Sequence, residues 1–246
     1  MEILGIDIGG SGIKGAIVDI EKGEFVEDRL RIPTPQPAKP EPVAEVVAEI
    51  SRHFEWTGPI GCTFPAVVKH GVTLTAANVD DEWIGTDAKS LIEQHTGNPV
   101  KVLNDGDAAG IAEMKFGAGK DRDGLVIILT LGTGIGSAFF MNGILIPNTE
   151  FGHLKIRGKD AENRASDRIR QEKGYSWEKW GKKLSEYFQY VEFLFTPDLF
   201  IVGGGVSKKY EKYFPHIYCN TEIVPAQLRN DAGIVGAAMA AKDLKL

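Results

Sequence analysis

A strand, a glycine turn and a second strand open this chain, and the same pattern returns in its middle. The first copy joins residues 3–8 to residues 13–18 through the turn 9–12, and the second joins residues 125–130 to residues 135–141. Apolar runs on both sides of a glycine turn predict a β-hairpin, because glycine adopts the backbone angles that tight turns need. The repetition predicts two related lobes, and this constrains the fold more than any other feature.

Strand and helix patterns alternate along the rest of the chain. Further strands are expected at residues 25–31, 60–64, 100–103 and 199–202, and a short hairpin around 69–71. Helices are expected around residues 43–50, 87–95, 107–116 and 232–241. This alternation predicts the α/β class. At 246 residues the chain is long enough for two lobes around a central cleft.

Composition narrows the classes of partner. The formal net charge of -6 argues against a nucleic-acid binder, which needs a basic surface. No stretch approaches the roughly 20 apolar residues of a membrane span, so no membrane partner is expected. The chain enters a strand pattern at once, without a basic and apolar leader, and a cytoplasmic location is the expectation.

One segment departs from the acidic average. Residues 155–183 contain ten basic and five acidic residues. One interpretation is a pair of solvated helix faces. The other interpretation is a basic surface that binds a polyanionic substrate. The sequence leaves both interpretations open.

Both glycine turns are suited to phosphate, because glycine lets backbone N–H groups approach a bound anion. A triple glycine before a helix pattern adds a third segment at which backbone N–H groups can approach an anion. The predicted phosphate-binding residues are Asp7, Gly9, Gly10, Ser11, Lys14, Thr130, Gly132, Thr133, Gly134, Gly203, Gly204 and Gly205. Asp7 is also the candidate ligand of Mg2+, which prefers hard oxygen ligands. The alternative is a plain hairpin with an incidental aspartate, and neither a P-loop motif nor a dinucleotide fingerprint is present.

Asn104 and Asp105 follow directly on a predicted strand. An aspartate there can accept the proton of an attacking hydroxyl, while Asn104 binds a neighbouring hydroxyl. The alternative is a helix N-cap, a role that Asp107 could also fill.

Glu150, His153 and Glu162 form a further polar group. Carboxylate and imidazole bind sugar hydroxyls well, and a site built on such bonds rejects ligands that lack them. A histidine of this kind can equally be structural, and zinc is disfavoured because cysteine ligands are missing.

Taken together, these motifs resemble the ROK sugar kinases of the actin-like, ribonuclease H-like superfamily. The resemblance covers residues 3 to about 240 and is strongest to the subgroup of polyphosphate glucokinases. The strings that carry the subgroup resemblance are residues 64–68, 75–80, 147–150 and 230–238.

The resemblance implies an actin-like ATPase fold and phosphorylation of glucose at the 6-hydroxyl by inorganic polyphosphate, with ATP as a further possible donor. It implies Asp105 as the general base and Mg2+ as the cofactor. The sugar-binding residues that it implies are Asn78, Asn104, Asp105, Glu150, His153 and Glu162. Many ROK kinases carry a zinc-binding cysteine cluster after the Glu-x-Gly-His motif, but residues 154–161 contain no cysteine, so no zinc is expected.

The expected domains are a small lobe of residues 1–105, completed by a C-terminal helix at 231–246, and a large lobe of residues 106–230. The resemblance also suggests a homodimer. Two alternatives stay open: an ATP-dependent glucokinase or glucomannokinase without polyphosphate use, and a sugar-sensing ROK regulator. The regulator would need a DNA-binding domain ahead of the first strand at Ile3. Acceptance of mannose, the balance between the two donors and the path of the polyphosphate chain are left open.

Overall fold

The computed structural model describes residues 1–228 and 231–245 and forms two compact units. Unit 1 comprises Met1–Ala112 and Asp231–Leu246, and unit 2 comprises Glu113–Asn230. The chain passes from one unit to the other within helix α3 (Asp105–Phe116). The lobe boundary at 105 and 106 stays a prediction. Asn230, from one of the resemblance strings, and Leu246 lie outside the described residues.

Unit 1 is built on a six-stranded sheet, whose main path runs β3-β2-β1-β5-β8, with β4 also paired to β2. Its strands are β1 (Glu2–Ile8), β2 (Ile13–Asp19), β3 (Glu24–Phe25), β4 (Leu30–Ile32), β5 (Ile60–Phe64) and β8 (Val100–Asn104). The β1–β2 hairpin is antiparallel, whereas β5 pairs parallel with both β1 and β8. The single strand expected at residues 25–31 is wrong, because the chain leaves β2 after β3 and returns to it as β4.

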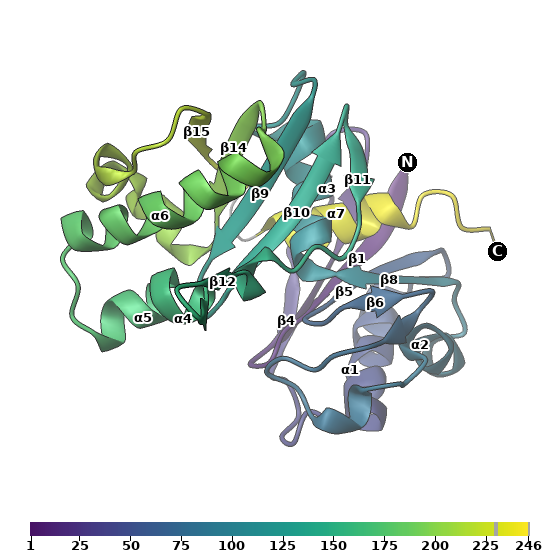
Figure 1. The fold of residues 1–246 in the computed structure, drawn as a ribbon. Coiled ribbons are helices and arrows are strands. Elements are labelled where there is room, and N and C mark those ends of the chain that lie inside the picture. The colour runs from purple at the N-terminus through teal and green to yellow at the C-terminus, as the bar shows by residue number, and fades with distance from the viewer. Residues whose placement is uncertain (229–230, 246) are drawn as a thin grey trace. The chain divides into compact units, whose positions relative to one another are not determined.

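Helices cover both faces of this sheet (Figure 1). The helices α1 (Pro40–His53) and α2 (Ala88–Thr96) bury apolar side chains against one face. The helix α7 (Ala232–Ala240) packs on β1 and β5. A Cβ atom on Gly5 would lie 2.1 Å from the Ile234 carbonyl oxygen, and one on Gly61 would lie 1.8 Å from that of Ala237. The two glycines therefore allow α7 to lie directly on the sheet.

The remaining elements of unit 1 are short. They are the hairpin strands β6 (Val68–Lys69) and β7 (Val72–Thr73) and the 3-10 helix η1 (Asp81–Trp83). The hairpin confirms the turn expected around residues 69–71.

Unit 2 repeats the strand order of unit 1, with the sheet β11-β10-β9-β14-β15. Its strands are β9 (Leu125–Leu131), β10 (Ile135–Met141), β11 (Ile144–Ile146), β14 (Leu199–Gly203) and β15 (Glu222–Pro225). In both sheets an antiparallel hairpin is followed by two parallel strands. The repeat expected from the two glycine turns is confirmed.

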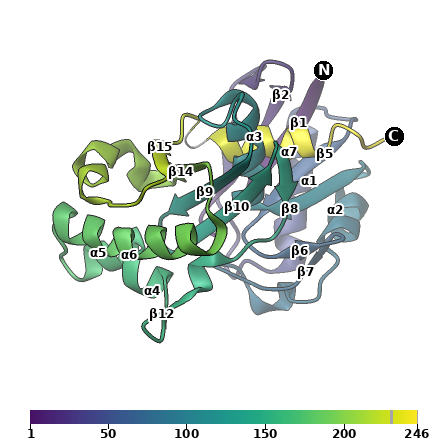
Figure 2. The ribbon, with the colours of Figure 1, turned by 45° about the horizontal axis from the view of Figure 1, so that its top comes forward.

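One long helix, α6 (Trp177–Phe195), lies beside β9 and β14 in both views (Figure 2). It buries Trp180, Leu184 and Phe188 in the core of unit 2. The shorter elements are η2 (Phe151–His153), β12 (Lys155–Ile156), β13 (Lys159–Asp160), α4 (Glu162–Ala165), α5 (Asp167–Glu172), η3 (Gly205–Lys212) and η4 (Phe214–His216). Across the described residues, every helix is too short or too polar to span a bilayer.

Candidate active site

The first glycine turn joins β1 to β2 and places a carboxylate beside an ammonium group. Asp7 and Lys14 are paired residues of the hairpin, and Lys14 Nζ lies 3.1 Å from Asp7 Oδ2. The Thr63 hydroxyl donates to Asp7 Oδ1 at 2.8 Å. Both side chains of the ion pair are about one quarter exposed, at 28% and 22%. The turn thus offers an oriented carboxylate and a cation together.

Three side chains from the segment after β3 bind the carbonyl groups of this turn. Arg31 Nη2 donates to the Ser11 carbonyl and Gln36 Nε2 to the Gly10 carbonyl, each at 3.0 Å. The buried Thr34 hydroxyl donates to the carbonyl of Gly9. These bonds fix the peptide planes of the turn. Sequence reasoning missed all three residues, which lie twenty or more positions away from their partners and belong to no motif.

Asn78 lies against the same turn. A Cβ atom on Gly10 would lie 2.5 Å from the Asn78 carbonyl oxygen. Asn78 itself adopts a positive φ of 62°, which asparagine tolerates better than most residues. The structure therefore brings this predicted sugar-binding residue next to the predicted phosphate-binding turn.

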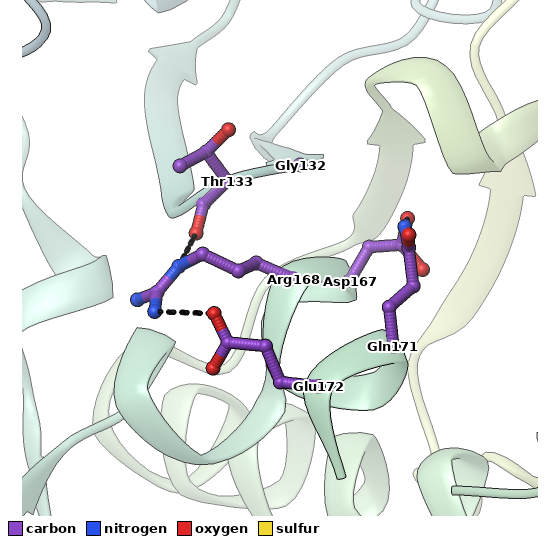
Figure 3. A pocket seen from close by; sticks show the side chains of 6 residues that line it. All are labelled: Gly132, Thr133, Asp167, Arg168, Gln171 and Glu172. Carbon is purple, nitrogen blue, oxygen red and sulfur yellow. Dashed lines mark hydrogen bonds and ion pairs between the residues drawn. The ribbon is translucent and has the colours of Figure 1, made fainter. Parts of the chain in front are cut away.

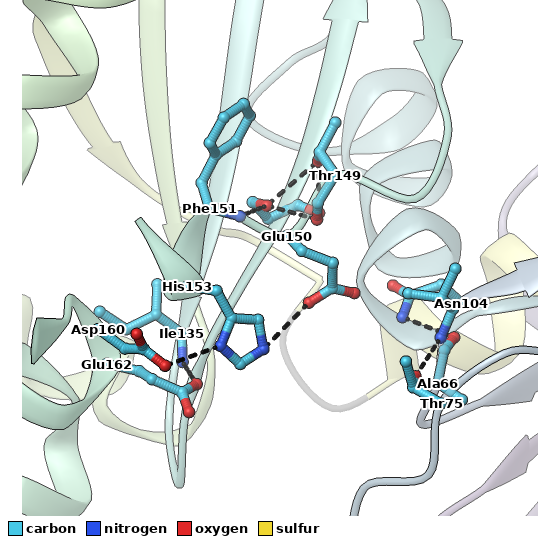
Figure 4. Close-up of polar contacts among 12 residues, drawn as sticks. Ala66, Thr75, Asn104, Ile135, Thr149, Glu150, Phe151, His153, Asp160 and Glu162 are labelled. Atoms are coloured by element: carbon cyan, nitrogen blue, oxygen red, sulfur yellow. Dashed lines mark hydrogen bonds and ion pairs between the residues drawn. The ribbon is translucent and has the colours of Figure 1, made fainter. Parts of the chain in front are cut away.

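Asn104 ends β8 and caps helix α3. Its Oδ1 accepts the N–H groups of Gly106 at 2.8 Å and Asp107 at 3.2 Å. Its Nδ2 donates to the Ala66 carbonyl at 3.1 Å (Figure 4). The capping alternative thus holds for Asn104, while Asp107 lies inside the helix. The predicted sugar contact of Asn104 would have to use its second amide hydrogen.

Asp105 is the first residue of α3, so the helix begins two residues earlier than expected. Its Oδ1 accepts the N–H of Gly106 at 2.8 Å. A carboxylate at a helix N-terminus is stabilised by the free N–H groups and the helix dipole. The position after a strand and at the start of a helix holds the predicted base on rigid backbone.

The second glycine turn and the triple glycine lie side by side in unit 2. Gly203, at the end of β14, is the parallel partner of Thr130 in β9. A Cβ atom on Gly204 would lie 2.3 Å from the Leu131 carbonyl oxygen. Two predicted phosphate-binding segments, distant in sequence, thus meet at the carboxyl ends of the neighbouring strands β9 and β14.

Glu150, His153 and Glu162 gather in the same unit (Figure 4). His153 Nε2 lies 3.9 Å from Glu150 Oε2. Glu162 Oε2 accepts the N–H of Ile135 at 3.3 Å, which places its carboxylate against the second glycine turn. Partial burial, together with the nearby Glu162 carboxylate, raises the pKa of Glu150, while His153 opposes the shift.

Asp160 joins this group, although sequence reasoning did not select it. Its Oδ2 lies 3.3 Å from His153 Nδ1, and its other oxygen binds Lys155. The hydrogen bonds from Lys155 and His153 hold the pKa of Asp160 below its ordinary value. Asp160 can therefore orient the His153 ring, leaving Nε2 for Glu150 or a ligand.

Ser137, in β10, holds the segment before η2 that carries Glu150. Its hydroxyl donates to the Thr149 carbonyl at 2.6 Å and accepts the Phe151 N–H at 3.0 Å. Thr149 returns a hydrogen bond from its hydroxyl to the Ser137 carbonyl at 3.0 Å. Glu150 is thus held between two residues anchored to β10.

A pocket of about 390 Å³ opens beside the second glycine turn (Figure 3). Its lining residues are Gly132, Thr133, Asp167, Arg168, Gln171 and Glu172. Arg168 Nε donates to the Thr133 carbonyl at 3.1 Å, and its Nη1 lies 3.3 Å from Glu172 Oε1. Of these residues, the sequence analysis predicted Gly132 and Thr133 to bind phosphate and counted Arg168 in the basic segment 155–183.

The donor set at Asp7 fits a magnesium ion that is coordinated mainly by phosphate and water. Such an ion needs only one or two protein carboxylates. Each Asp7 oxygen accepts one bond, from Lys14 or Thr63, and keeps a further lone pair. Within the described residues there is no group of three or more His, Cys, Asp or Glu side chains that could hold a metal by themselves.

Comparison with known proteins identifies relatives over almost the whole chain. The polyphosphate glucokinase of Mycobacterium tuberculosis (strain CDC 1551 / Oshkosh) is 53% identical over 237 residues, covering 96% of this chain and 89% of that protein. A solved structure of the inorganic polyphosphate/ATP-glucomannokinase of Arthrobacter sp. strain KM has a TM-score of 0.90 and 53% identity, covering 98% of both chains.

A third relative is more distant. The structure of a ROK family glucokinase from Streptomyces griseus, in complex with glucose and AMPPNP, has a TM-score of 0.83 and 25% identity, covering 99% of this chain and 100% of that one. These neighbours confirm the expected α/β fold of the actin-like ATPase type. The model of the ROK family matches residues 3–168. The chain therefore belongs to the ROK family.

Proposed function

We propose that this protein transfers the terminal phosphoryl group of inorganic polyphosphate to the 6-hydroxyl of glucose. The observation that carries the proposal is the 53% identity to a polyphosphate glucokinase across 96% of the chain. The similarly close polyphosphate/ATP-glucomannokinase supports ATP as a second donor.

In the proposed reaction the sugar oxygen attacks the terminal phosphorus in line with the bridging oxygen. A bond forms between phosphorus and O6, and the bond to the bridging oxygen breaks, so the polyphosphate leaves one phosphate shorter. Asp105 accepts the proton that the hydroxyl loses. Its place at the start of α3 supports this role, because a fixed base needs no reorientation before transfer.

We propose that five polar side chains bind the sugar. They are Asn78, Asn104, Glu150, His153 and Glu162. The hydrogen bonds that hold Asn104, His153 and Glu162 support the assignment, because pre-oriented polar groups discriminate between hydroxyl patterns.

The two glycine turns and the triple glycine are proposed to hold the phosphates. In unit 1 the residues are Asp7, Gly9, Gly10, Ser11 and Lys14, and in unit 2 Thr130, Gly132, Thr133, Gly134, Gly203, Gly204 and Gly205. Phosphoryl transfer by kinases generally needs a divalent metal, and Asp7 would hold Mg2+ here. When bound, the ion would neutralise charge on the phosphate oxygens.

We further propose that the protein acts in the cytoplasm as a homodimer, as the resemblance to ROK kinases implies. Light scattering of the purified chain at several concentrations tests the dimer. A mass of one chain at every concentration would contradict it.

The decisive test of the function is an initial-rate assay with glucose, comparing polyphosphate and ATP at equal magnesium. We expect glucose 6-phosphate from polyphosphate, with a lower or comparable rate from ATP. Activity with ATP alone would favour an ATP-dependent glucokinase. No product from either donor would refute the kinase proposal.

A further inference from the structure

Two elements of unit 2 lead away from the predicted phosphate-binding segments. Helix α5 contacts the second glycine turn, because Arg168 donates its backbone N–H to the Gly132 carbonyl at 3.1 Å. The 3-10 helix η3 begins at Gly205, the last residue of the triple glycine. Since Gly203 pairs with Thr130, both elements lie at the carboxyl ends of the neighbouring strands β9 and β14.

Both elements bring cations to the ring of Trp177, the first residue of α6. The guanidinium carbon of Arg170, from α5, lies 4.1 Å from the centre of this ring. The ammonium groups of Lys209 and Lys212, from η3, lie 6.0 and 5.8 Å from it. The face of an aromatic ring attracts cations and can hold them near one another.

A second ring gathers two more cations. Lys179 Nζ and Lys183 Nζ, both from α6, lie 4.6 and 5.2 Å from the centre of the Tyr175 ring. We call these seven residues the cationic cluster: Arg170, Tyr175, Trp177, Lys179, Lys183, Lys209 and Lys212.

The lysines of the cluster differ from most other basic residues of segment 155–183. Lys155, Arg157, Arg164, Arg168 and Lys182 all form ion pairs with carboxylates. In the part of the chain that the structure describes, none of the four cluster lysines forms such a pair, and only Arg170 does, with Asp167 at 2.7 Å. Like charges gathered without acidic partners repel one another, and a bound polyanion removes that repulsion.

We infer that the cationic cluster binds the distal phosphates of a polyphosphate chain whose terminal phosphates lie at the glycine turns. The inference rests on the proposed function and extends it from the reacting phosphate to the rest of the chain. A nucleotide has no phosphates beyond its third, so it has nothing to place in the cluster, whereas each internal phosphate of a long chain carries a negative charge.

The pocket beside the second turn is lined by helix α5, the helix that also carries Arg170 of the cluster. Arg168 and Gln171 line it, and Arg170 lies between them in sequence on the same helix. Its carboxylates are already engaged: Asp167 binds Arg170 and Gln171, and Glu172 binds Arg168. The negative charges of Asp167 and Glu172 are therefore partly compensated, and they repel a polyanion bound along α5 less strongly than free carboxylates would.

The test uses the full-length enzyme and the double variant Lys209→Ala/Lys212→Ala. Binding of end-labelled long-chain polyphosphate is followed by fluorescence anisotropy, and kcat/KM is measured for long-chain polyphosphate and for ATP. We expect the Kd for the long chain to rise about tenfold and its salt dependence to flatten, because phosphate contacts by lysine are lost. The ATP kinetics should stay within about twofold of wild type.

The control is Lys69→Ala/Lys120→Ala, which removes the same charge from exposed lysines outside the cluster. Lys179→Gln/Lys183→Gln is a second, independent pair that should weaken the long chain in the same way. A Kd unchanged in both cluster variants, or raised equally in the control, would overturn the inference. A competition experiment provides a further test, with an RNA oligonucleotide of equal charge as competitor. If this RNA displaces the labelled polyphosphate as effectively as unlabelled polyphosphate does, the inference is also overturned. Wild-type activity with polyphosphate tests the proposed function separately, because it does not depend on the variants.

Discussion

The Thr34 hydroxyl donates a hydrogen bond to the carbonyl of Gly9, twenty-five residues away in sequence. Thr34 is 5% exposed, so the bond is made within the protein and not shared with water. It fixes the plane of the peptide that joins Gly9 to Gly10, within the turn that is proposed to bind phosphate.

The Thr34→Val variant should therefore weaken donor binding. Valine keeps the shape of threonine but leaves the buried carbonyl without its donor, at a cost of about 1–3 kcal/mol. We expect KM for the donor to rise at least about fivefold, with a smaller change for glucose. Thr34→Ser, which keeps the hydroxyl, is the matched control. An unchanged KM for the donor in a folded Thr34→Val variant would show that the hydrogen bond from Thr34 to Gly9 does not position the turn.

Two neighbouring glycines should respond very differently to alanine. Gly204 has a φ of 84°, and a Cβ atom there would lie 2.3 Å from the Leu131 carbonyl oxygen. A Cβ atom on Gly205 would meet nothing within 4 Å. Gly204→Ala should lower the free energy of unfolding by about 2 kcal/mol or more, through backbone strain and the clash. Gly205→Ala should unfold near the wild-type midpoint in urea, and equal loss in both variants would contradict the explanation.

Asp105→Ala should cut turnover by roughly two to four orders of magnitude, because the proposed base is removed. Glucose binding, measured by isothermal titration calorimetry, should be largely retained. Asp105→Asn keeps the shape at the start of α3 and should show the same loss of kcat. Near-normal turnover in the asparagine variant would remove Asp105 from the mechanism.

His95 should make stability depend on pH. Its Nε2 lies 2.8 Å from Glu41 Oε2 and its Nδ1 3.3 Å from Glu45 Oε2, and the hydrogen bond to Glu41 in particular raises the pKa of His95. A raised pKa in the folded state means that the protonated ring favours folding. This contribution is complete below the unfolded-state pKa of about 6.5 and is lost as pH rises through the higher folded value.

Urea unfolding at about pH 6 and pH 8 measures this effect. The wild type should lose more stability over this interval than His95→Gln, and salt should reduce the difference because both glutamates are mostly exposed. The exposed His53, on α1, serves as the control in His53→Gln. An identical pH dependence in the wild type and His95→Gln would show that these ion pairs contribute nothing measurable.

Local pattern was enough to predict the two hairpins, because a glycine turn between apolar strands depends on neighbouring residues alone. It also placed Asn104 and Asp105 at the end of a strand. It misplaced the start of α3, because the cap is Asn104 and this depends on bonds to Gly106 and Asp107 that the sequence does not specify. It missed Asp160, since an aspartate beside a lysine is common on any surface.

By itself the sequence determined the repeated hairpins, the alternation of strands and helices and, through its motifs, the ROK family. Only the tertiary structure decided which distant residues meet: Thr34 with Gly9, Gly203 with Thr130, and Lys209 with Trp177. The physical reason is the distance along the chain over which each interaction acts. Turn and strand preferences arise within a few residues, whereas contacts between segments depend on how sheets and helices pack once the apolar side chains are buried.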